Sequence, residues 1–179
     1  MKPGKRYIIL GIVIAACVAY LALHKKDGTR YLLPTPPPVE REAITAVAVT
    51  KGGTTLRLEK RSGRWHLDPG GYPADPDRIK AMLDALRGLT LTALVSESGS
   101  YARYGLDEGS RIMVQAWAGN DGVRTLDIGT TVSTYQHTFV KLPGDGNVYH
   151  ARGNVRSHFE RSADDLRDKR VLSFSPSDI

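Results

Sequence analysis

The longest uninterrupted apolar run of the chain lies near its start, at residues 7–23. This run carries no charge, and its 17 residues approach the roughly 17 to 25 that one helix needs to cross a hydrocarbon core of about 30 Å. Basic residues precede it at Lys5 and Arg6 and follow it at Lys25 and Lys26. The pattern predicts a cytoplasmic tip and a single transmembrane anchor within residues 1–26, with the remaining chain outside the inner membrane.

Two processing routes compete with a retained anchor. A cleaved signal peptide needs a shorter apolar core and a small-residue cleavage site, and the run ends in Leu-Ala-Leu-His without such a site. Residues 14–17, Ile-Ala-Ala-Cys, are similar to a bacterial lipoprotein box in which Cys17 would be lipidated, but apolar residues continue beyond Cys17. A signal-anchor is the favoured interpretation, and lipidation of Cys17 stays open.

Residues 27–43 contain four prolines, three of them consecutive. Prolines at this density favour an extended polyproline helix that rises about 3.1 Å per residue. We therefore expect a spacer that holds an exported domain, residues 44–179, away from the bilayer. A ligand for a proline-recognition domain is the weaker alternative.

Alternating and clustered apolar residues predict several short antiparallel strands in residues 44–179. The expected strands are 44–50, 56–59, 65–67 and 89–95, followed by a meander of 112–118, 123–128, 137–142 and 148–151. One helical turn is expected around Tyr101 and Tyr104. Short helices are expected at 155–161 and after Ser162, whose spacing from Asp165 is typical of a capping box.

The best-defined helix is predicted to begin after Asp75 and to end at Gly88. Asp75 suits the N-cap, Pro76 suits the first helical position, and glycine suits the C-terminal stop. The apolar residues of this segment recur at helical spacing, at Ile79, Met82, Leu83 and Leu86,. Together the elements predict an α+β fold: an N-terminal single transmembrane helix, then antiparallel hairpins and a meander packed with a few helices.

Charge argues against nucleic-acid binding. The formal net charge is +6, but residues 1–43 hold seven of the 25 basic and three of the 19 acidic residues, which leaves a net charge of only +2 beyond. A nucleic-acid domain needs its own basic face, whereas basic flanks of an apolar helix attract anionic lipid. We expect no nucleic-acid partner.

Candidate catalytic and metal-binding residues are scattered. The histidines lack metal-ligand spacing, at His66, His137, His150 and His158,. Cys17 is the only cysteine, so there is neither a disulfide framework nor a thiol nucleophile in residues 44–179. The glycine-rich segments 119–122 and 144–147 lack the spaced acidic ligands of a calcium loop, and Asp164 and Asp165 diverge on a helix. We expect no catalytic, cofactor-binding or metal site, and no cofactor.

Seven short motifs carry a resemblance, in this order: Trp65-x-Leu67, Tyr72-Pro73-Ala74-Asp75, Tyr104-Gly105-Leu106-Asp107, Ile128-Gly129, the run 139–144, Val148-Tyr149 and Leu166-Arg167-Asp168-Lys169. Over residues 44–174 the chain resembles the bacterial family catalogued as domain of unknown function 4340, with Gly109 where the pattern leads us to expect proline. The resemblance implies a membrane-tethered, exported protein, in some cases one that accompanies an ABC transporter. It carries no catalytic residue over to this chain, which we expect to be one unit of a longer repeated architecture or a truncated longer one.

These observations favour a non-enzymatic, membrane-anchored envelope protein whose exported domain binds other envelope proteins, such as transporter components. The alternative is a cell-envelope enzyme, for example a glycan hydrolase, with carboxylates that no motif singles out.

Overall fold

The computed structural model describes residues 3–23 and 32–170, and the chain divides into two compact units, Met1–Leu32 and Leu33–Ile179. The regular element described in the first unit is helix α1 (Pro3–Leu23). The predicted boundaries at residues 26 and 43 stay predictions.

The predicted transmembrane helix is wrong. Within residues 3–23 and 32–170, no helix combines the length and the apolar character that crossing a membrane requires. The apolar run of 17 residues is at the lower limit for a span, and the first turns of α1 are occupied by Pro3, Gly4, Lys5 and Arg6.

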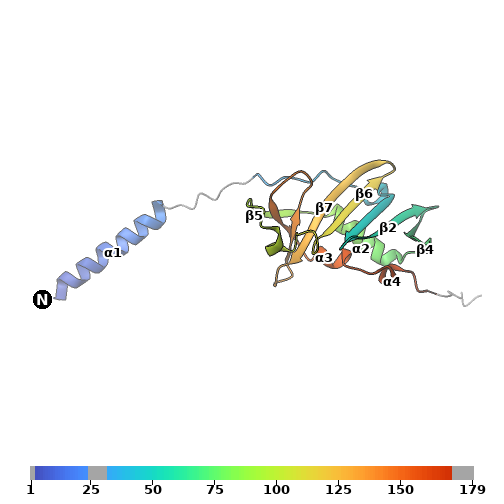
Figure 1. The fold of residues 1–179 in the computed structure, drawn as a ribbon. Coiled ribbons are helices and arrows are strands. Elements are labelled where there is room, and N and C mark those ends of the chain that lie inside the picture. The colour runs from blue at the N-terminus through green and yellow to red at the C-terminus, as the bar shows by residue number, and fades with distance from the viewer. Residues whose placement is uncertain (1–2, 24–31, 171–179) are drawn as a thin grey trace, which may run out of the picture. The chain divides into compact units, whose positions relative to one another are not determined.

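In the described part of the second unit, nine strands form one antiparallel sheet in the order β4-β3-β2-β1-β6-β7-β8-β9-β5 (Figure 1). The strands are β1 (Ala46–Lys51), β2 (Thr54–Arg61), β3 (Arg64–Asp68), β4 (Tyr72–Pro73), β5 (Leu91–Ser96), β6 (Ile112–Ala118), β7 (Asp121–Thr131), β8 (His137–Lys141) and β9 (Val148–Arg152). The predicted strands are all present. The sequence did not predict β4, nor that the hairpins and the meander join into one sheet.

Helices are few and short in this unit. They are α2 (Pro76–Arg87), α3 (Arg156–Phe159) and α4 (Ala163–Leu166), with single 3-10 turns at η1 (Arg41–Ala43) and η2 (Tyr101–Tyr104). The α+β class is therefore also wrong, because one large sheet dominates and only α2 exceeds four residues among them. The predicted N-cap of α2 is confirmed, because the Asp75 side chain accepts hydrogen bonds from the backbone N–H groups of Asp77 and Arg78.

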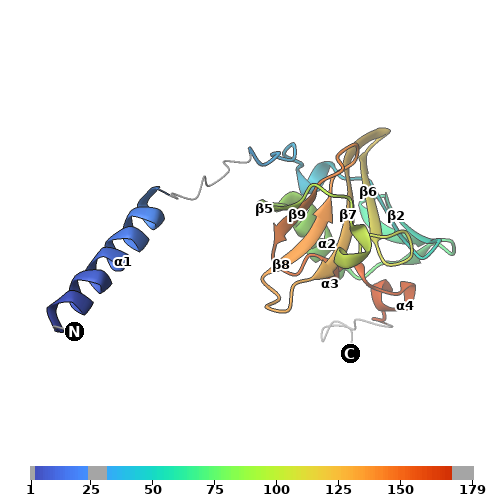
Figure 2. The same ribbon diagram turned by 60° about the vertical axis from the view of Figure 1, so that its left-hand side comes forward.

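The strand register separates the two faces of the sheet. On β1, Val47 and Val49 lie beside Leu58 and Leu56 of β2, and the partners on β6 are Ala116 and Val114. These residues, with Leu56 only half-buried, pack in one core with the apolar stripe of α2, with Phe159 and with Leu166. Helices α2, α3 and α4 therefore cover the same face (Figure 2).

The opposite face is covered locally by η2 and the residues that follow it. Gly129 of β7 lies so close to this segment that a β-carbon there would stand 2.2 Å from the carbonyl oxygen of Tyr104. Gly105 adopts a left-handed conformation with φ of 63°, and a β-carbon on it would stand 2.6 Å from the methyl carbon of Thr130. Two segments of the family resemblance therefore pack directly against each other.

Residues 33–43 contact the sheet domain. Val39 is buried, Leu33 packs against the core, and Arg41 forms an ion pair with Asp84 of α2. The side chain of Arg124 on β7 is only 6% exposed, and its Nη2 donates a 2.7 Å hydrogen bond to the carbonyl oxygen of Pro37. Part of the proline-rich segment thus belongs to the packed domain.

Candidate binding groove

A groove of about 610 Å³ lies where the helix-covered face of the sheet reaches strands β1 to β3. Its walls are these strands, Tyr72 of β4, residues 159–163 where α3 ends and α4 begins, and Arg167. The apolar lining consists of Val49, Leu56, Leu67, Pro69, Tyr72, Phe159 and Ala163. Because the volume falls within the range of pockets that hold small ligands or side chains, the groove can receive part of another molecule.

Charged side chains surround this apolar lining: Lys51, Asp68, Glu160, Arg161 and Arg167. Both carboxylates have basic partners, since Asp68 pairs with Arg61 at 2.7 Å and Glu160 pairs with Lys51. Arg161 and Arg167 form no ion pair within the described residues. The groove therefore offers two cationic groups that form no ion pair within the described chain, although the charge of Arg161 helps to lower the pKa of Asp165.

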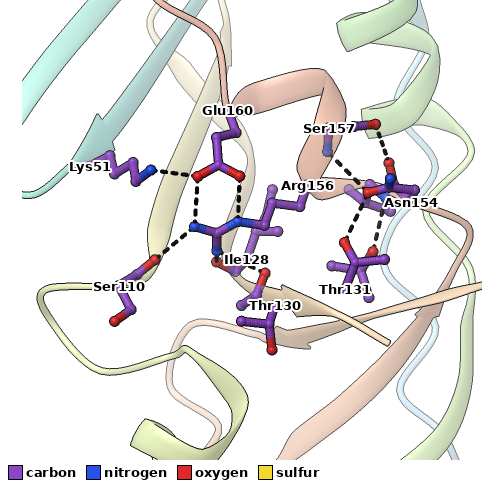
Figure 3. A network of polar contacts seen from close by, with 12 residues as sticks. Lys51, Ser110, Ile128, Thr130, Thr131, Asn154, Arg156, Ser157 and Glu160 are labelled. Carbon is purple, nitrogen blue, oxygen red and sulfur yellow. Dashed lines mark hydrogen bonds and ion pairs between the residues drawn. The ribbon is translucent and has the colours of Figure 1, made fainter. Parts of the chain in front are cut away.

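Glu160 is fixed by Arg156 as well as by Lys51 (Figure 3). The Nε and Nη2 atoms of Arg156 donate hydrogen bonds of 2.8 and 3.1 Å to the two carboxylate oxygens of Glu160. These bonds, with the bond from Lys51 next in importance, lower the pKa of Glu160 to about 2. Glu160 is therefore ionised near neutral pH and is unsuited to act there as a general acid.

The position of Arg156 is set by three backbone carbonyls. Its Nη1 donates to Gly129 at 3.0 Å and to Ile128 at 3.5 Å, and its Nη2 donates to Ser110 at 3.2 Å. Figure 3 shows the guanidinium between these carbonyls and the carboxylate of Glu160. The network thereby fixes the Glu160 side of the groove to β7 and to the loop before β6.

Arg167 and Tyr72 form the other end of the groove. The guanidinium carbon of Arg167 lies 3.8 Å from the centroid of the Tyr72 ring, which is a cation–π contact. Beside it, the backbone N–H of Asp75 donates to Leu166 and that of Asp168 donates to Pro73, at 2.8 and 2.9 Å. The two motifs around Tyr72 and Arg167, far apart in sequence, are therefore joined in space.

The acidic residues in and beside these two motifs cap helices or pair with basic side chains. Asp75 caps α2, and Asp165 forms the predicted capping box with Ser162. Asp168 accepts hydrogen bonds from Arg170, which lower its pKa, and Asp164 pairs with Lys169. Asp164 and Asp165 thus have separate basic and capping partners rather than a shared site.

Two of the four histidines that the structure describes lie together, on the face opposite α2. The rings of His137 and His150 stack with centroids 5.2 Å apart, and Phe139 lies 4.9 Å from His150. Burial, followed by the charge of His137, lowers the pKa of His150. His66 and His158 are elsewhere, on β3 and α3. No group of three potential metal ligands occurs in the described chain.

Sequence reasoning did not identify the groove. Its residues come from four strands, β1 to β4, from the connection after α3 and from Arg167 beyond α4, so no local spacing brings them together. Tyr72 and Arg167 belong to two family motifs that the sequence led us to interpret as structural. The presence of a tyrosine and an arginine in two separate family motifs was the available signal.

Comparisons with known proteins give one result. No curated protein and no solved structure matches the chain. The family described as "Domain of unknown function (DUF4340)" matches residues 65–179, which include the groove residues from Leu67 onward. The matched part exceeds half of the chain, and the chain therefore belongs to the DUF4340 family.

Proposed function

We propose that the sheet domain is a non-catalytic interaction domain of the cell envelope, and that its groove binds a segment of another envelope protein. The observation that carries this proposal is the combination of an apolar lining with Arg161 and Arg167, which form no ion pair within the described chain. Tyrosine and arginine are enriched among the residues that dominate binding energies in protein interfaces. Association with an ABC-transporter-type assembly is supported by the family resemblance.

The arrangement of the acidic groups favours binding over catalysis. A glycan hydrolase of the common type needs one protonated and one ionised carboxyl group at the bond that is cleaved. The groove contains Asp68 and Glu160, and Glu160, with a pKa of about 2, does not hold a proton near neutral pH. Asp68 is paired with Arg61.

The proposal is tested by capture of a partner with the tagged full chain from detergent-solubilised envelopes. Thr54 is exposed and lines the groove, so Thr54→Trp fills the groove with little effect on folding. Thr134→Trp, at an exposed position that does not line the groove, is the matched control. We expect the wild type and the control to capture a stoichiometric partner and Thr54→Trp to lose it.

Two results would contradict the binding proposal or the proposed site. If no stoichiometric partner is captured and the purified chain hydrolyses cell-wall glycans, the binding proposal fails and the enzyme alternative replaces it. If Thr54→Trp captures the partner as well as the wild type does, binding occurs at another surface.

The proposed location outside the cytoplasm has its own test. It is supported by the absence of cysteine beyond Cys17, which suits an oxidising compartment. Alkaline phosphatase, which is active only outside the cytoplasm, is fused after Ile179, and we expect activity. An inactive phosphatase, with activity from a cytoplasm-only reporter at the same point, would overturn the location.

A further inference from the structure

The charges of the groove favour one kind of partner. Its two carboxylates are already engaged, Glu160 with Lys51 and Arg156 and Asp68 with Arg61. Arg161 and Arg167 are exposed and form no ion pair within the part of the chain that the structure describes. The charge of Arg161 is partly offset by Asp165, whose pKa it helps to lower. A ligand therefore meets positive charge at the rim chiefly at Arg167, and this charge attracts anionic groups and repels cationic ones.

One of these arginines is held in place before a ligand arrives. The cation–π contact with Tyr72, with the guanidinium carbon 3.8 Å from the ring centroid, holds the head group of Arg167 over the ring. The backbone of Arg167 is fixed too, because it forms a β-bridge with Ala74. A guanidinium donates two parallel hydrogen bonds to a carboxylate, and less side-chain entropy is lost when it is already ordered.

The apolar floor of the groove favours apolar side chains in the ligand. Leu67 and Phe159 are 3% and 2% exposed, and Val49 is 6% exposed, so the floor is formed by side chains that are fixed in the core. The apolar area that a ligand can still cover belongs to Leu56, which is half-buried, and to Tyr72, which is 47% exposed, and covering it gains free energy. Strong polar recognition is confined to the rim.

We infer that the groove binds an extended peptide segment in which large apolar side chains flank an acidic residue. The apolar side chains lie on the floor, and the carboxylate accepts hydrogen bonds from Arg161 and Arg167. This inference rests on the proposed function and names the chemistry of the partner at the same site.

The test uses fluorescein-labelled peptides of alternating leucine and aspartate, with leucine–asparagine and leucine–lysine peptides of the same length as controls. Binding to the purified full chain is measured by fluorescence anisotropy at low and high salt. We expect the aspartate peptide to bind, the asparagine peptide to bind at least about tenfold more weakly, and the lysine peptide not to bind. The preference for aspartate should weaken at high salt.

Alanine variants test whether the rim arginines supply the positive charge that selects the aspartate peptide. Arg161→Ala and Arg167→Ala should each weaken binding of the aspartate peptide by about tenfold, while Arg103→Ala, an exposed arginine on η2, leaves binding unchanged. Arg161 has no ion pair within the described residues, so its variant is expected to fold, and circular dichroism checks this for all three.

The outcomes are separable from those of the partner capture. Equal binding of the aspartate and asparagine peptides, or full affinity of both groove variants, overturns the acidic-segment inference. If Thr54→Trp still abolishes partner capture in that case, the groove remains the binding site and only the proposed chemistry is wrong.

Discussion

Arg167 lies over the ring of Tyr72, with its guanidinium carbon 3.8 Å from the ring centroid. This contact lies beside the backbone hydrogen bonds that join Asp75 to Leu166 and Asp168 to Pro73. The short edge strand β4 is thus covered by residues 166–168, which keeps its backbone from pairing with another chain.

The contact predicts a measurable contribution to stability. Arg167→Met keeps much of the side-chain length but removes the charge, and exposed cation–π contacts contribute about 0.5 to 1 kcal/mol. We expect the free energy of unfolding of the full chain, measured in urea, to fall by about that amount. Arg103→Met is the control and should change it little. Equal stability of the two variants would mean that the Tyr72 contact contributes nothing.

Asp75 tests whether a family motif is structural. Asp75→Ala removes the N-cap of α2 and should lower the free energy of unfolding by about 0.5 to 2 kcal/mol, whereas Asp75→Asn keeps a capping oxygen and should cost little. Peptide binding by the folded fraction should survive both changes. If Asp75→Ala left the melting temperature unchanged but abolished binding, Asp75 would be a functional carboxylate.

Gly129 should tolerate no side chain. A β-carbon there would meet the Tyr104 carbonyl oxygen at 2.2 Å, whereas one on Gly109 would meet its nearest neighbour, an oxygen of Asp107, at 3.6 Å. Overpacking of this kind costs about 1 to 3 kcal/mol. We expect Gly129→Ala to lower the melting temperature clearly and Gly109→Ala to have little effect. Similar melting temperatures for both variants would contradict the close approach of η2 to β7.

The low pKa of Glu160 predicts that this residue accounts for part of the loss of stability at acid pH. Its pKa is lowered from an ordinary value of 4.5 to about 2, so the unfolded chain binds more protons than the folded chain between these values. The contribution of Glu160 to stability is therefore complete above about pH 4.5 and is lost as the pH falls toward 2. Urea unfolding of Glu160→Gln at several pH values should show a weaker decline over this range. A decline as steep as in the wild type would assign the acid sensitivity to other groups.

Arg124 should hold residues 33–43 in place. Burial lowers its pKa, its Nε lacks a hydrogen-bond partner within the described structure, and Nη2 donates to Pro37. In Arg124→Met, relief of the buried charge offsets the lost hydrogen bond, so we expect the free energy of unfolding to change by no more than about 1 kcal/mol. Amide exchange at Ala43 and Ile44, whose N–H groups donate to the carbonyl oxygens of Glu40 and Arg41, should nevertheless become faster. Unchanged exchange at these amides, or an equal effect in the exposed control Arg152→Met, would show that Arg124 does not hold the segment.

The elements that the sequence predicted correctly depend on neighbours within a few positions. Asp75, Pro76 and Gly88 mark the ends of α2, and Ser162 with Asp165 marks the start of α4. The presence of the strands was likewise predicted from the local alternation of apolar and polar residues and from the turn residues between them. The pairing of β1 with β6 and of β9 with β5 is between segments far apart in the chain, and local patterns carry no information on it.

The groove and the packed proline-rich segment were missed for a related reason. Composition described residues 27–43 as extended, but burial of Val39 depends on a surface formed by elements much later in the chain. The same holds for Arg161 and Arg167, which are ordinary basic residues until the sheet places an apolar floor beside them.

The packing of residues 33–43 has a mechanical consequence. These residues lead directly into β1, which is hydrogen-bonded along both sides, to β2 and to β6. A pull applied through the segment would first strain the bond between Arg124 and Pro37. Further load would act along the axis of β1 and would be shared by two hydrogen-bonded ladders at once, so the domain should resist tension at this end better than an edge strand could.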